Sequence, residues 1–359
     1  MDHALRQLTD QVNDARHRAA PLRICGGGSK DFYGQTLQGE RLNTTALNGI
    51  TSYEPSELYI RAGAGTPLVD IEAALAKHHQ TLPFEPPHFG PGATLGGMVS
   101  AGLSGPARPS AGSVRDHVLG VSLLNAQGQQ LQFGGTVMKN VAGYDVSRLL
   151  VGALGILGVV TEVSLKVLAQ PVAEATLVFE LDEAGAIAQL NRWGGLPLPL
   201  NASCWHADRL WVRLRGAHAA VQAAQARMGG MVLRDDAPVF WASLREQTHP
   251  FFALQPGQAL WRVSVPDTTP PLGLGASLLE WGGGQRWLKH TPNFDTKLRS
   301  ALVESGGHAT LFRAPAEVQR TDVAVFSPLS PPLARIHREL KKEFDPVGIF
   351  NRGRFYADL

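Results

Sequence analysis

The sequence predicts an α+β fold in two parts: a glycine-rich first half, and a second half of antiparallel strands with helices packed on one side. Hydrophobic residues make up 44% and charged residues 18% of the 359, so the chain has enough apolar material for a buried core. Up to about residue 170, glycine clusters separate short strands and helices. After Pro171, strand-like runs such as ATLVFEL and DRLWVRLRG follow. This change, from glycine clusters to strand-like runs, predicts a boundary between two parts of the chain near residue 170.

The first elements carry ordinary helix and strand signals. Residues 1–20 have the pattern of an amphipathic helix, and residues 22–25 form an apolar run that breaks into three glycines. Residues 58–65 predict a second strand. After Pro67, apolar residues recur at helical spacing, which predicts a helix there.

Later segments are equally regular, with one exception. Residues 118–133 predict a hairpin, 159–168 an alternating strand, and 217–228 and 332–344 helices. Residues 83–113 have almost no periodic pattern. A structureless stretch of this length inside a compact domain is usually functional or disordered, and its small, apolar residues argue against disorder.

Composition excludes several classes of protein. The formal net charge of +2 and the absence of a Lys/Arg run argue against a nucleic-acid partner. Two cysteines, Cys25 and Cys204, cannot ligate an iron–sulfur cluster, which needs four. The N-terminus lacks the apolar core of a signal peptide, and no apolar run reaches 18 residues. We therefore expect a cytoplasmic protein.

The segment Ile24–Ser29 contains three consecutive glycines after a strand. Backbone N–H groups without Cβ neighbours can converge on an anion such as a pyrophosphate. The G-x-G-x-x-G fingerprint of dinucleotide-binding βαβ units is absent. Taken alone, the segment is equally compatible with a tight structural turn.

Two further segments add to this pattern. Pro91–Gly102 is dense in small residues, which lets a flat ligand lie against the main chain, and Thr94 and Ser100 supply hydroxyl groups. Lys139–Asp145 precedes the glycine-spaced run 149–161, which can present backbone groups to the edge of a planar ring. Three glycine-rich segments in one region need a common explanation.

In order, these segments resemble the FAD-binding domain of the vanillyl-alcohol oxidase and p-cresol methylhydroxylase (PCMH) family. The resemblance covers residues 1–170 and implies two α/β subdomains that clamp an extended FAD, with a smaller C-terminal cap of antiparallel sheet and helices. It further implies a set of cofactor-binding residues: Cys25, Gly26, Gly27, Gly28, Ser29, Pro91, Gly92, Thr94, Gly96, Gly97, Ser100, Ser110, Ser113, Asp116, Gly155, Gly158, Val159, Val160 and Asn351. Covalent members carry a histidine in the first loop where this chain has Ser29, so the resemblance implies dissociable FAD.

The segment 344–354 resembles the closing D-P-x-x-x-x-N-P-G-K/R segment of the same family, with Arg352 in place of the usual proline. The whole chain resembles the E-type FAD subunits of bacterial glycolate oxidase (dehydrogenase) complexes. That resemblance implies a larger FAD-containing subunit (D) and an iron–sulfur subunit (F) as partners, and contact with the inner membrane through the complex as an option. The expected domains are 1–170 for FAD, 171–335 for the cap and 336–359 for the returning segment.

A 2-hydroxy-acid oxidase needs a cation for the carboxylate and a base for the hydroxyl proton. Arg286 and Arg313, with Arg262, are the candidate cations, and His290 and His308 are the candidate bases. For each of them, an ordinary surface or interface side chain is the alternative, and the more frequent one. The metal-binding His-x-Gly-Asp-Gly-Asn-x-His motif of D-2-hydroxy-acid dehydrogenases is absent, and we expect no metal. Glycolate oxidation on the sister subunit, with this FAD relaying electrons, is therefore one hypothesis.

Three interpretations stay open at this point. The first is the FAD subunit of a complex that oxidises glycolate and similar 2-hydroxy acids such as D-lactate. The second is a stand-alone FAD-dependent oxidoreductase of a hydroxy acid or sugar lactone, and the third a non-catalytic assembly subunit with structural FAD. All seven tryptophans lie beyond residue 190, where they form either a partner surface or a core.

Overall fold

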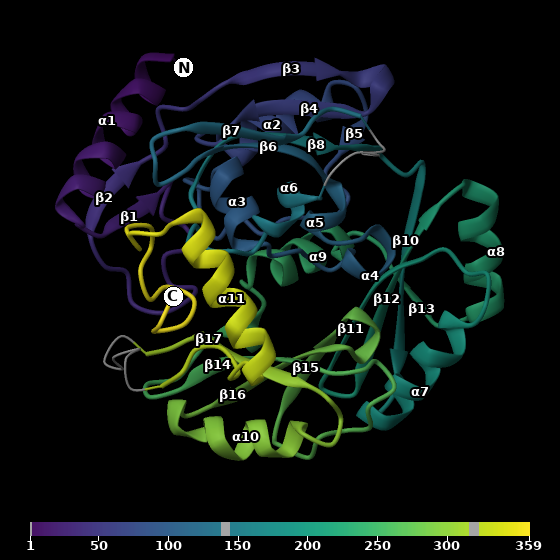
Figure 1. Cartoon of the computed structure of the whole chain (residues 1–359). Coiled ribbons are helices and arrows are strands. Elements are labelled where there is room, and N and C mark those ends of the chain that lie inside the picture. Colours follow the sequence, from purple (N-terminus) through teal and green to yellow (C-terminus); the bar gives the residue numbers. More distant parts are fainter. Residues whose placement is uncertain (1, 138–143, 316–322) are drawn as a thin grey trace.

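Two antiparallel sheets frame the molecule, and glycine-rich loops lie between them (Figure 1). The computed structural model describes residues 2–137, 144–315 and 323–359. The predicted segment Lys139–Gly143 lies outside these ranges. Structure therefore bears only on the remainder of that motif.

The first sheet has five strands in the order β3-β4-β8-β6-β7, and every neighbouring pair is antiparallel. The predicted hairpin is confirmed as β6 and β7. The central strand β8 is buried on both faces, and Ser164 is buried along with Val163 and Leu165, so the predicted alternation holds only in part. The strands are β3 (Ile50–Glu54), β4 (Tyr59–Gly63), β6 (Val118–Leu124), β7 (Gln130–Gly134) and β8 (Val159–Lys166).

Short helices cover the inner face of this sheet. The predicted helix after Pro67 is confirmed as α2. Within the stretch that lacks a periodic pattern, α3 forms although two of its residues are glycine, because Thr94 caps it and its apolar residues are buried. These helices are α2 (Leu68–Ala76), α3 (Leu95–Ala101), α5 (Val114–His117) and α6 (Val146–Leu149), whereas the short α4 (Arg108–Ala111) lies against the second sheet.

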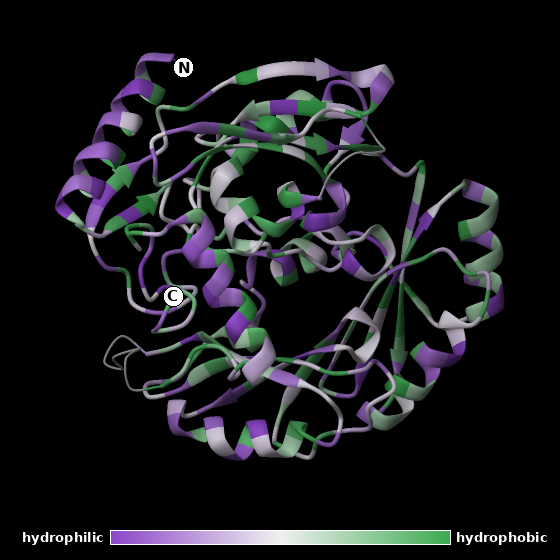
Figure 2. Cartoon of the chain, viewed as in Figure 1, coloured by the Kyte–Doolittle hydropathy of each residue, from purple (hydrophilic) through white to green (hydrophobic). Residues whose placement is uncertain are grey.

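The N-terminal helix α1 (Asp2–Arg18) packs against a small parallel pair, β1 (Leu22–Cys25) and β2 (Glu40–Asn43). In Figure 2 this helix is mostly hydrophilic, and its few apolar residues meet the apolar cluster beneath it. The C-terminal segment returns to this point: Leu22 bridges to Phe350 after helix α11 (Pro331–Phe344). A second pair joins β5 (Gln80–Thr81) to β9 (Leu168–Ala169).

The second sheet has eight strands in the order β13-β10-β12-β11-β15-β16-β14-β17, all antiparallel. The predicted antiparallel sheet of the second half is confirmed. Its strands are β10 (Ala173–Glu180), β11 (Leu200–His206), β12 (Arg209–Gly216), β13 (Met231–Leu233), β14 (Ala259–Ser264), β15 (Ser277–Glu280), β16 (Gln285–His290) and β17 (His308–Arg313).

Helices lie on both faces of this sheet. The outer face packs against α7 (Glu183–Gly194), α8 (His218–Met228) and α10 (Asp295–Leu302). The inner face meets α9 (Ala237–Glu246) and residues of the first half, so the expectation of helices on one side only is incomplete. No helix within the described ranges is long and apolar enough to cross a membrane.

Most of the tryptophans form core. Five of the seven are buried, with exposed fractions of 7% or less, and Trp211 and Trp281 are intermediate. The core interpretation therefore holds for these five, and they do not provide a partner surface. The domain boundaries after residues 170 and 335 stay a prediction.

Candidate cofactor and active site

A pocket lies where the three predicted glycine-rich loops and the C-terminal segment meet. One end is formed by β1 and its following loop, and the other by Tyr33, Ala101 and Leu154, which pack with aromatic residues of the second sheet. Most residues predicted to bind the cofactor line it: Cys25, Gly26, Gly27, Gly28, Ser29, Thr94, Gly96, Gly97, Ser100, Gly155, Gly158, Val160 and Asn351.

The first loop has the geometry of an anion-binding nest. No hydrogen bond among the described residues uses the backbone N–H groups of Gly26, Gly27, Gly28 or Ser29. Gly28 has a φ of +77°, which L side chains rarely adopt. Unsatisfied N–H groups that line a pocket are suited to phosphate oxygens. The loop therefore fits the pyrophosphate of a dinucleotide.

The first and second loops touch through their backbones. A Cβ atom added to Gly27 would lie 1.5 Å from the carbonyl oxygen of Gly92, and one added to Gly26 would lie 2.4 Å from Oγ1 of Thr94. Thr94 also accepts the N–H of Gly97 at 3.3 Å. Glycine is required here because two main chains approach with no room for a side chain.

The third loop is tied to the first by Asn351. The Nδ2 atom of Asn351 donates to the carbonyl of Leu154 at 2.7 Å, and its Oδ1 accepts the N–H of Ile24 at 2.8 Å. Gly155, with a φ of +73°, passes so close that an added Cβ would lie 2.8 Å from Nδ2 of Asn351. The predicted residue Asn351 thus joins the two loops.

Other residues around the pocket escaped the sequence prediction. Arg354 donates to the carbonyls of Asp31, Tyr33 and Gln35, which fixes the segment after the first loop. Lys30 also lines the pocket, and burial lowers its pKa to about 8, against the charge of Glu246. The only feature of the sequence that could have indicated Lys30 is its position directly after the glycine loop.

Six predicted cofactor residues do not line this pocket. Ser110 donates to the carbonyl of Asn201 at 2.9 Å, so it joins the two halves. Ser113 and Asp116 form the capping box of α5, and hydrogen bonds from Ser113 keep the pKa of Asp116 low. Gly92 lies against Gly27, Pro91 is exposed, and Val159 is buried in the apolar cluster that α1 covers. Structural contacts account for most of these positions.

The candidate catalytic residues Arg286 and His290 face away from the pocket. On β16 they alternate with Trp287, which packs on the inner face, so they point to the outer helices. Arg286 donates to the carbonyls of Gly283, Pro270 and Thr269, and His290 stacks on Phe294 with ring centroids 3.7 Å apart. These contacts correct the prediction for both, because their polar groups hold loops.

Arg313 and Arg262 lie on the inner side. Arg313 stacks over Phe32 at 3.8 Å and donates to Gln247. Arg262 donates to the hydroxyl of Tyr33 at 3.0 Å, and Tyr33 lines the pocket. The other candidate base, His308, is exposed at the start of β17. Among the described residues, no three His, Cys, Asp or Glu side chains are grouped to hold a metal ion.

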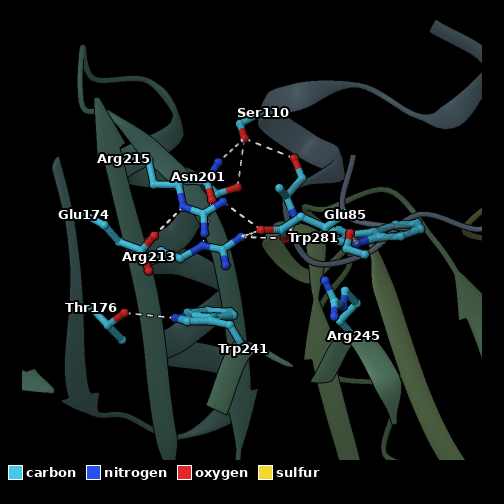
Figure 3. Close-up of polar contacts among 12 residues, drawn as sticks. Glu85, Ser110, Glu174, Thr176, Asn201, Arg213, Arg215, Trp241, Arg245 and Trp281 are labelled. Carbon is cyan, nitrogen blue, oxygen red and sulfur yellow. Dashed lines mark hydrogen bonds and ion pairs between the residues drawn. The ribbon is translucent and has the colours of Figure 1, made fainter. Parts of the chain in front are cut away.

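A polar clasp joins the two halves (Figure 3). Glu85 accepts hydrogen bonds at 2.7 Å from both Arg213 and Arg215 of β12, and at 3.1 Å from the N–H of Ala107. Arg215 also pairs with Glu174 at 2.6 Å. We call Glu85, Arg213 and Arg215 the interdomain clasp. It fixes the loop that leads into the second glycine-rich segment.

A family model described as an FAD binding domain matches residues 4–147. The glycolate oxidase subunit GlcE of Escherichia coli (strain K12) is 48% identical over 353 residues, which cover 98% of this chain and 97% of that subunit. The chain belongs to the GlcE family. Membership and the family match confirm the predicted FAD-binding fold and an FAD-dependent oxidoreductase subunit.

More distant relatives match only part of the GlcE-family chain. The glycolate oxidase subunit GlcD of Bacillus subtilis (strain 168) is 29% identical over 172 residues, or 48% of this chain and 35% of GlcD. The mitochondrial cytochrome-type D-lactate dehydrogenase of Arabidopsis thaliana is 27% identical over 143 residues, 39% of this chain and 25% of that enzyme. Alkyldihydroxyacetonephosphate synthase matches in fold, with a TM-score of 0.67 at 14% identity, over 96% of this chain and 74% of its own.

Proposed function

We propose that the chain is the FAD-carrying subunit of a glycolate dehydrogenase complex, which oxidises glycolate and similar 2-hydroxy acids such as D-lactate. The observation that carries the proposal is the 48% identity to the E. coli glycolate oxidase subunit GlcE over nearly the whole of both chains. Its proposed partners are a GlcD-like flavoprotein subunit and an iron–sulfur subunit that receives the electrons. The proposed location is the cytoplasm, with any contact to the inner membrane made through the complex.

The residues of the pocket have the character that FAD needs. The free N–H groups of the first loop would hold the pyrophosphate, and the small residues of the second and third loops would let the ring system lie against the main chain. FAD supplies the hydride acceptor when it is bound. The chain's own task is then to hold the cofactor and exclude water around it.

We propose that the FAD is bound without a covalent link. The lining of the described pocket contains no histidine. The one cysteine in it, Cys25, is buried, with its sulfur 2.9 Å from Nε of Arg41. Precipitating the purified protein with acid is expected to release all of the FAD into the supernatant, whereas a yellow pellet would contradict this proposal.

The complex is tested by purifying the tagged chain from its native host and analysing the cofactors of every protein that accompanies it. The proposal expects a second flavoprotein and an iron–sulfur protein, and glycolate-dependent dye reduction by the assembly. A chain that comes without either partner would favour a stand-alone oxidoreductase. A colourless chain with no affinity for added FAD would overturn the proposed function altogether.

A further inference from the structure

A small cavity lies on the inner face of the second sheet, against the loop 87–106 of the first half. It adjoins the cofactor pocket at two points. Leu103 lines the cavity and follows α3, whose residues Ser100 and Ala101 line the pocket. Arg262 lines the cavity and donates to the hydroxyl of Tyr33, which lines the pocket. A molecule bound in this cavity would therefore lie beside the cofactor.

One side of the cavity is cationic without a compensating acid. Arg262 has no ion pair with an acid in the part of the chain that the structure describes, and neither has Arg108. The two guanidinium groups interact: burial and then the charge of Arg262 lower the pKa of Arg108, and the charge of Asp116 opposes this shift. Arg108 stacks over Trp281 at 4.4 Å. Arg262 therefore brings to the cavity a guanidinium group without an acid partner, and Arg108 adds positive charge nearby although it does not line the cavity.

The opposite side of the cavity holds a buried carboxyl group. Glu280 on β15 is 3% exposed, and its Oε2 accepts hydrogen bonds from Nε1 of Trp287 at 2.6 Å and Nε2 of Gln285 at 3.1 Å. Burial raises the pKa of Glu280 to about 7, which the charge of Glu85 reinforces. Such a carboxyl group can take up a proton near neutral pH.

The groups around Glu280 leave its charge unpaired. Cys204 lies opposite on β11, and burial followed by the charge of Glu280 raises the pKa of that thiol. Glu85 approaches from the first half. Of the cations that line the cavity, Arg245 pairs with Glu246, and Arg262 makes no ion pair with Glu280 within the described ranges. The carboxyl group is thus held by hydrogen bonds alone.

Strand register places Arg262 and Glu280 on one face. Arg262 lies opposite Trp287, and Glu280 opposite Gln285, two residues farther along β16. Paired residues share a face of the sheet, and β16 is the one strand between β14 and β15, so the two backbones are about 10 Å apart. The long arginine side chain spans part of this distance. Both side chains line the cavity, together with Trp287 of the strand between them.

We propose that this cavity binds a small 2-hydroxy acid, with Arg262 holding the carboxylate and Glu280 accepting the hydroxyl proton. The inference rests on the proposed function and places a substrate site on this chain. Oxidation breaks the O–H bond, whose proton goes to Glu280, and the C–H bond of the carbinol carbon, whose hydride goes to the flavin. A C=O bond forms, so the acid loses two electrons and the flavin gains them.

The test uses the purified FAD-loaded chain and the variants Arg262→Met and Glu280→Gln, with Arg234→Met as a control because Arg234 is an exposed arginine of the second half. Oxalate, a planar carboxylate probe, is titrated while the flavin absorbance is recorded. Arg262→Met is expected to raise the Kd for oxalate about tenfold or more, since a hydrogen-bonded charge pair is lost. Glu280→Gln and Arg234→Met are expected to leave it within about threefold.

Anaerobic bleaching of the flavin by glycolate provides the second readout. The wild-type rate is expected to rise with pH around 7, and Glu280→Gln to lower the rate roughly 100-fold and remove this dependence. If Glu280→Gln fails to fold, the pH dependence of the bleaching rate of the wild-type chain tests the role of Glu280: a rate that does not change around pH 7 would contradict it. A yellow chain whose spectrum does not respond to oxalate or glycolate would overturn this inference alone. A colourless chain would overturn the proposed function as well.

Discussion

Glu85 shows how one charged side chain can connect two parts of a fold. Its backbone has a φ of +48°, in a region that few residues with a side chain adopt. Its carboxylate is 15% exposed and is shared between Arg213 and Arg215. Burial alone would disfavour its charge, but the two arginines outweigh burial and keep the pKa of Glu85 below its ordinary value. The ionised clasp therefore stabilises the folded state.

Replacing Glu85 by Gln is expected to lower the free energy of unfolding by about 3 kcal/mol, because the buried Arg213 loses its counter-charge, while the half-buried Arg215 keeps its pair with Glu174. A carboxyl group with a lowered pKa stabilises the fold above its unfolded pKa of about 4.5, and this stabilisation is lost as the pH falls through the folded pKa. Below pH 4.5, the free energy of unfolding measured in urea should therefore fall more for the wild-type chain than for Glu85→Gln. The control is Glu174→Gln, which is more exposed; an equal loss there would contradict the role of the clasp.

At Gly27, a single residue determines whether the first two loops can lie against each other. A methyl group there would overlap the carbonyl of Gly92, so Gly27→Ala is expected to separate the first two loops and reduce FAD content to near zero. Gly194→Ala, where an added Cβ meets nothing within 4 Å, should keep its FAD. The flavin-to-protein absorbance ratio measures both. Full FAD in Gly27→Ala would disprove the close approach of the loops.

At the scale of elements, hydrogen bonds attach the C-terminal segment to the loops that line the pocket. Lys341 on α11 is buried and donates to the carbonyls of Ile156 and Phe350 and to Asp345, at 2.7–2.8 Å. Ile156 belongs to the third loop. Together with Asn351, this lysine ties the end of the chain to the third loop.

Lys341→Met is expected to destabilise the fold by about 3–5 kcal/mol, since it leaves Asp345 as an unpaired buried charge. It should also raise the Kd for FAD, because the third loop loses an anchor. Lys342→Met changes the exposed neighbour on the same helix and should leave both quantities as they are. Quenching of FAD fluorescence gives the Kd. An unchanged value in a folded Lys341→Met variant would contradict the link to the loop.

At the scale of the whole molecule, an apolar cluster joins loops and α3 of the first half to the second sheet. The cluster between them combines Tyr33, Ala101, Leu103 and Leu154 of the first half with Trp241, Trp287 and other aromatic residues of the second. The clasp adds charged contacts beside it. We therefore expect the two halves to unfold together.

All seven tryptophans lie in the second half, whereas FAD would be held by the first half and the C-terminal segment. Tryptophan fluorescence thus reports one half and FAD release the other. The two urea transitions of the FAD-loaded chain are expected to coincide, and FAD at 100 times its Kd should add about 2.7 kcal/mol to the free energy of unfolding. In Glu85→Gln the transitions should draw apart. Separate transitions in the wild-type chain would refute the coupling.

The sequence by itself determined the elements and the cofactor loops. Hydrophobic periodicity located several of the helices and strands, such as α2, α8 and the hairpin β6–β7, and clustered glycines located Cys25–Ser29 and Pro91–Gly102, because local backbone preferences and side-chain spacing decide both. These features depend on neighbours along the chain. The return of Asn351 to the first half came only from the resemblance to the family, and its contacts are long-range.

Only the tertiary structure decided which polar side chains face one another. Arg286 and Arg262 are both arginines on strands of one sheet, yet strand alternation and register turn the first to the outer helices and the second toward the pocket. Glu85, Glu280 and Lys341 carried no signal in the sequence, because their surroundings come from segments up to 185 residues away, as in the contact between Lys341 and Ile156. The partners, the protonation state and the burial of such a side chain depend on how the whole molecule packs, so the neighbouring residues in the sequence do not determine them.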